Sequence, residues 1–293
     1  MTRLRTKGHN LKPICNYVGI SRQAYHKRLQ RTNTKHNMYN TMEKIVLKNR
    51  QIKSRSGLRT IFYKENLSTY LGVNQFEEQM SARGYALKPY RSFVKTTDSR
   101  GHHYKFDNLI EGLELDRPNQ VIVGDITYYT YRSELYYIFQ FVDYYTLEIK
   151  GLLASKNMEG VNSEKCLRQV IKYNKCNNYK NNMIIHTDAG AQYRSHKYQS
   201  MLRKYGIQPS QAKSCFENGL SERANGIIKN EYLIDYEIKS VTHLNRILKQ
   251  IQNQANNIWP SMTLGYKTPT QYAAWVRGLD KKERPKKQVK IIQ

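Results

Sequence analysis

The stretch that decides the fold is QVIVGDITYYTYRSELYYIFQFVDYYTLEIKGLLAS, residues 120–155. It contains three consecutive runs, 120–131, 134–145 and 146–155, that are rich in the β-branched and aromatic residues favoured in strands. Short polar turns at Arg132-Ser133 and Tyr145-Thr146 separate these runs. Because strands joined by such short turns pair with antiparallel neighbours, the segment predicts an antiparallel meander.

Helical and strand-like segments alternate after the meander. In chain order they are a helix from about Met158 to Tyr173, an apolar strand MIIH at 183–186, a helix near Ser195 to Lys204, a fifth strand in GIQPS at 206–210, and a helix near Glu217 to Leu233. A further helix spans about Thr242 to Asn257. The order β-β-β-α-β-α-β-α predicts an α/β fold in which helices flank a mixed sheet.

The first third of the chain has a helical pattern without the period-two alternation of strands. Within it, LKPICNYVGISRQAYHKRLQR at 11–31 predicts a helix, a tight VGIS turn, and a second helix that Ser21 caps and that runs to about Arg31. This is the pattern of a helix-turn-helix unit, whose second helix contacts base edges and phosphates near its N-terminal end. The candidate DNA-binding residues at that end are Ser21, Arg22, Gln23, Tyr25 and His26. The alternative is a two-helix corner with a solvated basic face.

A second helical module follows. A helix from about Tyr39 to Gln51 precedes a segment in which Gly72-Val73-Asn74 forms a turn, Asn74 caps the next helix, and Gly84 ends it. Polar, weakly periodic residues ending in Pro118 then indicate a linker. The predicted organisation is a helical DNA-binding region at 1–91, a linker at 92–118, a catalytic core at 119–278 and a basic tail at 279–293.

Charge narrows the function classes. The chain has 49 Lys and Arg against 23 Asp and Glu, a formal net charge of +26, which attracts a polyanion, most commonly nucleic acid. An acidic lipid surface is the alternative partner. No stretch is long and apolar enough to cross a bilayer, and the first residues lack the apolar stretch of a signal peptide, so we expect a cytoplasmic protein without a membrane partner.

Cysteines and glycines exclude other classes. Cys15, Cys166, Cys176 and Cys215 are too scattered for a disulfide framework or paired zinc knuckles, and we expect reduced thiols. Neither GxGxxG nor a Walker-type glycine-rich loop occurs, so nucleotide-driven chemistry is disfavoured.

Acidic residues in and beside the strands are the candidates for chemistry. Asp125 interrupts the first apolar run, where a carboxylate is costly unless a cation compensates its charge. Asp188 follows the fourth run, and the two carboxylates would converge if the fourth strand lay beside the first. Glu222 lies in a helix whose polar face also carries Asn225 and Lys229. Three such acids could hold two divalent cations for phosphodiester chemistry, although Asp143 is an equally plausible strand acid by position.

At these residues the sequence resembles the transposases of bacterial insertion sequences in the retroviral-integrase superfamily, specifically the two-frame family whose second frame carries an Asp-Asp-Glu core. GDITYY resembles the first-aspartate block, IIHTDAGAQYRSHKY the second, ENGLSERANGIIKNEYL the glutamate block, and LGYKTPTQY the C-terminal signature. The resemblance covers about residues 110–275 well and 10–95 weakly. It implies a ribonuclease-H-like core with a mixed five-stranded sheet, preceded by the all-α helix-turn-helix region.

The resemblance also implies a function. It places the catalytic and metal-binding carboxylates at Asp125, Asp188 and Glu222 of a transposase that uses Mg²⁺ or Mn²⁺, as two ions, to free element ends and join their 3′-hydroxyls to target DNA. Its implied partners are double-stranded DNA of the element ends and target, further copies of the chain on paired ends, and a first-frame helix-turn-helix protein. Such an enzyme works at the bacterial nucleoid.

Basic residues and departures from the family pattern complete the prediction. Lys213, Arg223 and Lys229 flank the glutamate and are candidate phosphate contacts. The chain has Gly124 where a threonine is common, alanines beside Asp188, and Trp259 and Ser261 where relatives tend to have arginine and histidine. These departures keep open an alternative, a catalytically inactive DNA-binding protein that is either a decayed copy or a regulator. A third candidate is a structure-selective nuclease of the same fold.

Overall fold

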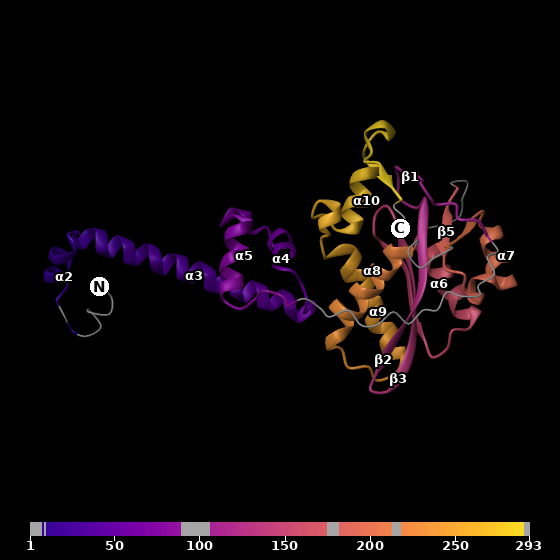
Figure 1. The fold of residues 1–293 in the computed structure, drawn as a ribbon, viewed down its shortest axis with the longest axis horizontal. Coiled ribbons are helices and arrows are strands. Elements are labelled where there is room, and N and C mark those ends of the chain that lie inside the picture. Colours follow the sequence, from indigo (N-terminus) through magenta and orange to yellow (C-terminus); the bar gives the residue numbers. More distant parts are fainter. Residues whose placement is uncertain (1–7, 9, 89–105, 175–181, 213–217, 290–293) are drawn as a thin grey trace.

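A five-stranded mixed sheet is the centre of the molecule (Figure 1). The computed structural model describes residues 8, 10–88, 106–174, 182–212 and 218–289. The strands are β2 (Val121–Tyr131), β3 (Glu134–Asp143), β4 (Ile149–Ser155), β5 (Ile184–Thr187) and β6 (Gln208–Gln211). Their order across the sheet is β4-β3-β2-β5-β6. The first three pair antiparallel, and β5 and β6 run parallel to β2, which confirms the predicted meander and mixed sheet.

The turn between β2 and β3 explains the length of this hairpin. Arg132 and Ser133 have φ angles of 47° and 66°, the left-handed backbone that a two-residue hairpin turn needs to match the twist of its strands. The ladder begins at once with Tyr131 opposite Glu134 and continues in unbroken register to Ile122 opposite Asp143. The turn predicted at Arg132-Ser133 is therefore confirmed.

Helices cover both faces of the sheet. The helices α6 (Gly160–Tyr173) and α7 (His196–Lys204) pack on the face that carries Ile122. The helices α8 (Gly219–Ile227) and α9 (Val241–Asn257) pack on the opposite face, which carries Val121 and Val123. This alternation along β2 reflects the period-two geometry of strands, and it gives a three-layer α/β/α core.

The N-terminal region is entirely helical within its described part. It consists of α2 (Leu11–Val18), α3 (Arg22–Ile52), α4 (Leu58–Lys64) and α5 (Val73–Ala82). The prediction that the second helix ends near Arg31 is wrong, because α3 runs on without interruption for 31 residues. Residues 32–38 contain no Gly or Pro to stop it, and Thr32 and Thr34 donate their hydroxyl protons to carbonyls four residues earlier.

The prediction that Asn74 caps the next helix is also wrong. Gly72, not Asn74, precedes the first residue of α5. Asn74 already lies inside the helix, where its side-chain oxygen accepts a bond from Arg59 of α4. By contrast Gly84 ends this helical segment as predicted, with a φ of 88° and its N–H donated to the carbonyl of Ser81.

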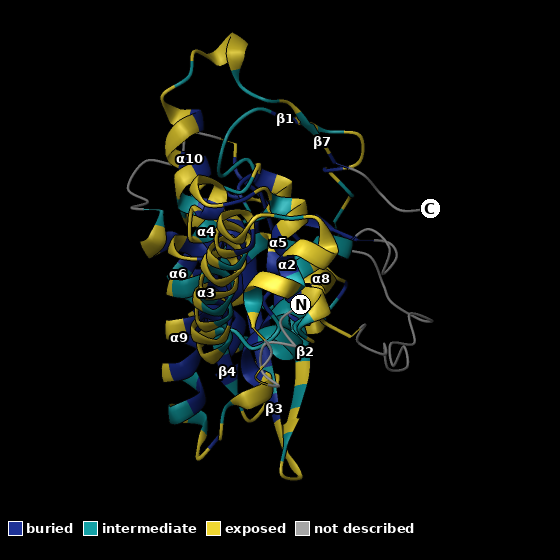
Figure 2. Cartoon of the chain, turned by 90° about the vertical axis from the view of Figure 1, so that its left-hand side faces the viewer, coloured by how far each residue is buried: buried dark blue, intermediate teal, exposed yellow. Residues whose placement is uncertain are grey.

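The inner half of α3 packs with α4 and α5 through buried Met42, Val46, Ile61, Phe76 and Met80. Its outer half extends away from the sheet and carries α2 at its far end (Figure 1). Figure 2 shows α2 and this outer half largely in the colour of exposed residues. The helical region is therefore divided into a packed base and a projecting arm.

The C-terminal part closes over one end of the core. Helix α10 (Pro269–Arg277) precedes the short strand β7 (Lys287–Gln288), which pairs antiparallel with β1 (Glu114–Leu115). This pairing joins the predicted linker to the predicted basic tail. The remaining short helical turns are η1 (Leu67–Thr69), η2 (Ala191–Arg194), the π-helical η4 (Ile228–Tyr232), η5 (Leu233–Asp235), η6 (Met262–Leu264) and η7 (Lys281–Glu283). Among the described residues, no helix is both long and apolar enough to cross a bilayer.

Candidate active site

The parallel pairing of β2 with β5 brings two acidic residues to one level of the sheet. Val123 of β2 is the register partner of His186 of β5, and Asp125 and Asp188 each stand two residues further along their chains. The expectation that the fourth strand lies beside the first is confirmed. Asp125 therefore lies within the long strand β2, whereas Asp188 occupies the carboxyl end of β5, a common position for functional groups in such sheets.

The surroundings of Asp125 disfavour the negative charge of its carboxylate. Burial, followed by the negative charge of Asp188, raises the pKa of Asp125 to about 7. The charge of Glu222 raises this pKa further, while a bond from Asn225 opposes the rise. The net rise of the pKa means that burial and like charges disfavour the ionised carboxylate more than its hydrogen bonds favour it.

Glu222 comes from a different layer. It lies in the first turn of α8 and is exposed. Among the residues that the structure describes, no three His, Cys, Asp or Glu side chains form a close metal-binding group. Asp125, Asp188 and Glu222 are thus electrostatic neighbours rather than an assembled ligand set.

The donor set nonetheless suits a hard divalent cation. All three side chains offer carboxylate oxygens, which are the ligands Mg²⁺ and Mn²⁺ prefer. The pKa of Asp125 is raised by burial and then by repulsion from Asp188, and the charge of a bound cation would offset both effects. The residues present therefore fit the metal that the sequence resemblance implies.

One face of the continuous helical segment α8–η4 makes side-chain hydrogen bonds to β2. Asn225 is buried and donates its side-chain N–H to Oδ2 of Asp125 at 2.7 Å. One turn later, the Lys229 ammonium donates to the hydroxyl of Thr127 at 2.8 Å, and burial lowers the pKa of this lysine. The polar face predicted for this helix thus points at the strand that carries Asp125.

Two further side-chain amides hold α8 on the sheet, and neither was predicted from the sequence. Gln140 of β3 is fully buried opposite Asp125 and donates from Nε2 to the carbonyl of Ser221 at 2.7 Å. Asn218 donates to the carbonyl of Gly124 at 3.1 Å. The available signal for Gln140 was its place as a lone amide in the apolar run YYIFQFV.

The glycine beside Asp125 has a packing reason. A Cβ on Gly124 would lie 2.3 Å from Cε1 of Phe141 and 3.1 Å from Cγ2 of Thr187. The ring of Phe141 therefore occupies the space that a side chain at position 124 would need. Glycine at position 124, where relatives commonly have threonine, therefore fits the packing of Phe141.

Trp259 is a second departure from the family pattern, and two lysines of the helical region place positive charge beside it. Trp259 is buried, and the ammonium groups of Lys53 and Lys64 lie 5.5 and 5.2 Å from its ring centroid. Ser261 instead belongs to a local bridge, where its N–H donates to the carbonyl of Lys267. Position 259 thus has positive charge beside it although its own side chain is neutral.

Asp143, which sequence pattern could not separate from Asp125, holds a turn. It is fully buried, and its carboxylate accepts from the backbone N–H groups of Asn119, Tyr145 and Thr146 at 2.6, 2.9 and 2.8 Å. Burial raises the pKa of this carboxyl, and Lys150 opposes the rise. These bonds assign Asp143 to the connection between β3 and β4.

The predicted DNA-binding residues of the helical region fall into two groups. Ser21 caps α3 by accepting from the N–H of Ala24 at 3.0 Å. Tyr25 is 6% exposed, so its side chain is largely buried. The exposed side chains Arg22, Gln23 and His26 line an open groove together with Lys27 and Gln30.

The predicted phosphate contacts near Glu222 have different outcomes. Arg223 is exposed on α8, and Lys229 is half-buried against β2. Lys213 lies outside the described residues, as do Cys176 and Cys215. The two described cysteines, Cys15 and Cys166, are buried free thiols, as expected.

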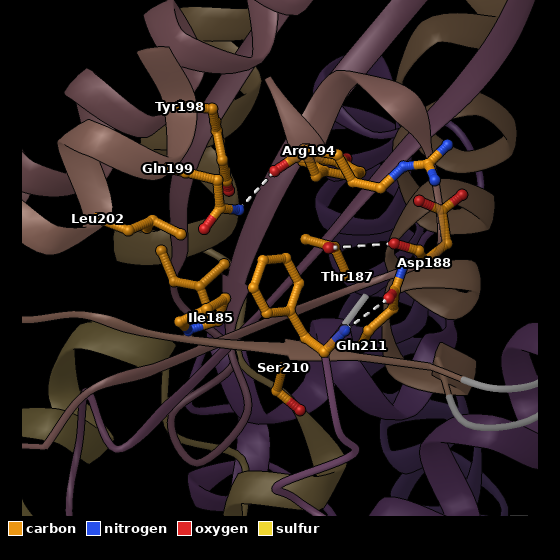
Figure 3. Close-up of a pocket in the computed structure, with 12 residues that line it drawn as sticks. Ile185, Thr187, Asp188, Arg194, Tyr198, Gln199, Leu202, Ser210 and Gln211 are labelled. Carbon is orange, nitrogen blue, oxygen red and sulfur yellow. Dashed lines mark hydrogen bonds between the residues drawn. The ribbon is translucent and has the colours of Figure 1, made fainter. Parts of the chain in front are cut away.

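A small hollow lies behind Asp188 (Figure 3). Its volume is about 10 Å³, enough for roughly one water molecule. Gln199 closes one side by donating to the carbonyl of Tyr193 at 2.7 Å. The hollow is therefore part of the support of the Asp188 loop and is too small for a substrate.

Comparison with known proteins agrees with this architecture. Residues 116–214 match one family model described as integrase core domain, and residues 203–269 match a second model with the same description. The chain is 27% identical over 197 residues to the transposase of insertion sequence element IS904 from Lactococcus lactis, covering 66% of this chain and 77% of that protein. It is 24% identical over 252 residues to transposase InsF of IS3A from Escherichia coli, covering 81% and 86%.

Solved structures give matches of lower overall similarity. The HTLV-2 integrase catalytic core in complex with magnesium is 24% identical and covers 54% of this chain and 97% of that one, with a TM-score of 0.43. The simian T-cell lymphotropic virus intasome in complex with a PP2A regulatory subunit is 18% identical, covers 78% and 74%, and has a TM-score of 0.46. From the family matches and the sheet described above, residues 116–269 resemble an integrase core domain, and the chain resembles insertion-sequence transposases of the integrase superfamily.

Proposed function

We propose that this protein is a DNA transposase that cleaves insertion-sequence ends and joins their 3′-hydroxyls to target DNA by two-metal-ion chemistry. Asp125, Asp188 and Glu222 are the proposed catalytic and metal-binding carboxylates. The observation that carries the proposal is the parallel pairing of β2 with β5, which brings Asp125 and Asp188 to one level of the sheet. The pKa of Asp125, raised by burial and by the charges of Asp188 and Glu222, supports it. A pKa this perturbed in a cluster of acids is typical of functional sites.

Each neighbouring side chain has a role in this scheme. Asn225 orients the Asp125 carboxylate through its bond to Oδ2. Gln140 and Asn218 hold α8, and with it Glu222, against β2 and β3. Lys229 and exposed Arg223 supply positive charge for DNA phosphates. Two Mg²⁺ or Mn²⁺ ions would supply charge neutralisation at the phosphate and activation of the attacking oxygen.

The proposed partners follow from this chemistry. The substrates are double-stranded element ends and target DNA, and joining two ends requires further copies of the chain. A first-frame helix-turn-helix protein is a second proposed partner. Because the substrate is bacterial DNA, the proposed location is the nucleoid within the cytoplasm.

A catalytically inactive DNA-binding protein is the second candidate. It is favoured by the absence, among the described residues, of a close group of three metal-binding side chains. Both candidates predict salt-sensitive DNA binding, so binding does not separate them. Metal-dependent joining does.

The test is a strand-transfer assay with Mg²⁺ or Mn²⁺ on DNA carrying the ends of the encoding element, with the first-frame protein supplied. Glu222→Gln keeps the shape of the side chain and removes its charge, and we expect joining to fall by about 1,000-fold or more, since metal stabilisation of the transition state is worth several kcal/mol. Glu237→Gln is the matched control, because Glu237 is exposed and pairs with Arg132.

Each outcome of this assay has one meaning. Normal joining by Glu222→Gln would overturn the assignment of Glu222. Wild-type binding without cleavage or joining would favour the inactive DNA-binding protein. Cleavage without joining, independent of end sequence, would identify a structure-selective nuclease instead.

A further inference from the structure

Within the part of the chain that the structure describes, the outer half of α3 has no buried residue beyond Tyr25 that would explain its length. Within Arg22–Ile52, all of which the structure describes, the buried residues are Tyr25, Met42, Val46 and Asn49. The residues from 26 to 41 are exposed or only partly buried. A helix that is polar on all sides bridges between other parts of an assembly or needs another source of stability.

Charge makes this half of the helix less stable in isolation. Lys27, Arg31 and Lys35 follow one another at four-residue spacing and are exposed, so three like charges form one row. No Asp or Glu precedes Glu43 in the sequence to neutralise them. Thr32, Asn33 and Thr34 add residues of low helix propensity. A bound polyanion would relieve this repulsion.

The sequence of this half does not suit a second helix as the occupant. A coiled coil needs apolar residues repeated at heptad spacing, and the stretch from Arg22 to Asn37 offers Ala24, Tyr25 and Leu29 and then no apolar side chain for eight residues. Its charge is complementary to DNA phosphates. We therefore commit to DNA as the partner of this row.

The inner end of α3 is anchored to the helix that carries the candidate glutamate. Lys53, the residue after α3, forms an ion pair with Glu231 at 2.6 Å, and its side chain is 12% exposed. Its ammonium also lies 4.9 Å from the ring centroid of Tyr232. Glu231 and Tyr232 belong to η4, which continues directly from α8. The arm is thus fixed at its base to the element that bears Glu222.

We propose that α3 is a spacer that sets the distance along the DNA between the base sequence bound at its N-terminal end and the phosphodiester bond at the active site. This inference rests on the proposed function and adds a geometric constraint to it. With 31 residues, α3 is about 46 Å long at roughly 1.5 Å per residue. That length corresponds to about 14 base pairs at roughly 3.4 Å per pair.

The test changes the length of the spacer. Twenty-five helix-forming residues inserted between Asn33 and Thr34 lengthen α3 by about 37.5 Å, or about 11 base pairs, and keep both the helix and the DNA within roughly 20° of their original phase. Wild type and this variant are each given two DNA ends, the natural end and an end with about 11 extra base pairs between the footprinted block and the cleaved bond. We expect wild type to cleave the natural end, and the variant the extended end, better by about tenfold or more, because misplacement costs base contacts.

Two further variants sharpen the result. A five-residue insertion at the same point adds length but turns the recognition end by roughly 140°, and we expect it to lose the footprint on both ends. Lys53→Met loosens the base of the arm, and we expect it to cleave the two ends with less than about threefold preference while keeping its footprint. Circular dichroism checks that each variant folds.

The outcomes separate this inference from the proposed function. If wild type leaves no footprint inside the element end, DNA recognition by α3 itself fails. If wild type leaves a footprint and cleaves, but the lengthened in-phase variant shares its preference for the natural end, the spacer proposal is wrong and the transposase proposal stands.

Discussion

At the scale of single residues, fully buried Asp143 and half-buried Asp125 both have a raised pKa but have opposite roles. Asp143 accepts three backbone N–H bonds and is part of a turn. Asp125 accepts bonds from the backbone N–H of Ile126 and the side chain of Asn225, and it faces the negative charges of Asp188 and Glu222. The two carboxylates differ in their partners. The hydrogen bonds of Asp143 stabilise the fold, whereas the negative charge of ionised Asp125 destabilises it.

Asp125→Asn should stabilise the metal-free protein at alkaline pH. Because the pKa of Asp125 is raised from 3.8 to about 7, its native carboxyl keeps its proton while the unfolded one loses it, and stability falls as pH rises through this window. The variant carries no such penalty. With EDTA present, we expect its Tm to exceed that of wild type at pH 8 and the difference to vanish towards pH 4.

Two comparisons check the origin of that effect. Asp143→Asn should lower the free energy of unfolding by about 1–3 kcal/mol already at pH 4, where Asp125→Asn has no effect, since it disturbs buried hydrogen bonds. Added Mg²⁺ at pH 8 should raise the Tm of wild type more than that of Asp125→Asn. A Tm difference for Asp125→Asn that does not change between pH 4 and 8 would contradict this account.

At the scale of elements, the relation between α8 and the sheet depends on amide side chains rather than on apolar packing alone. The bond from Gln140 to the carbonyl of Ser221 fixes the helix directly above β3. Asn218 and Asn225 add bonds to β2 on either side of it. Directional bonds of this kind set the register of a helix more sharply than an apolar face does.

Gln140→Leu should therefore reduce joining more than it reduces DNA binding. We expect joining to fall by about tenfold and the free energy of unfolding by about 1–3 kcal/mol, because one buried bond is lost. Gln169→Leu is the matched control, since Gln169 accepts from the N–H of Leu152 at 2.9 Å on the other side of the sheet. It should lose comparable stability and keep joining per folded molecule, measured with the same DNA ends. Equal loss of joining in both variants would refute a positioning role for Gln140.

At the scale of the whole molecule, the positive charge is concentrated away from the candidate catalytic carboxylates. Residues 1–105 contain 22 Lys and Arg against five Asp and Glu. In the described part of this region, the exposed arm of α3 lies far from the sheet (Figure 1). Under the proposed function, DNA recognition and chemistry belong to different parts of one chain, which α3 and the Lys53 ion pair with Glu231 connect.

The salt dependence of DNA binding tests this division. Replacing Lys27, Arg31 and Lys35 with Gln should lower the magnitude of the slope of log K against log salt by about 2.7, at roughly 0.9 per phosphate contact. The control replaces Lys165, Arg168 and Lys172 on α6, which are also exposed. It should leave the slope within about 0.5 of wild type. Equal changes in both variants would show that net charge alone, not the arm, governs binding.

Local pattern determined a large part of this protein from the sequence alone. The three strands of the meander, the turn at Arg132-Ser133 and the Ser21 cap are each encoded within about ten residues, so periodicity and turn chemistry sufficed. The family resemblance selected Asp125 over Asp143. The sequence pattern also placed Asn225 and Lys229 on one polar face of a helix.

Only the tertiary structure decided which distant residues meet. The bonds from Gln140 to Ser221 and from Asn225 to Asp125 join residues 81 and 100 positions apart, and the contact of Lys53 with Glu231 joins two regions of the chain. Such contacts follow from the parallel pairing of β2 with β5 and from the docking of helices on the sheet. They depend on the folded path of the chain, whereas a local pattern specifies only the element in which each residue lies.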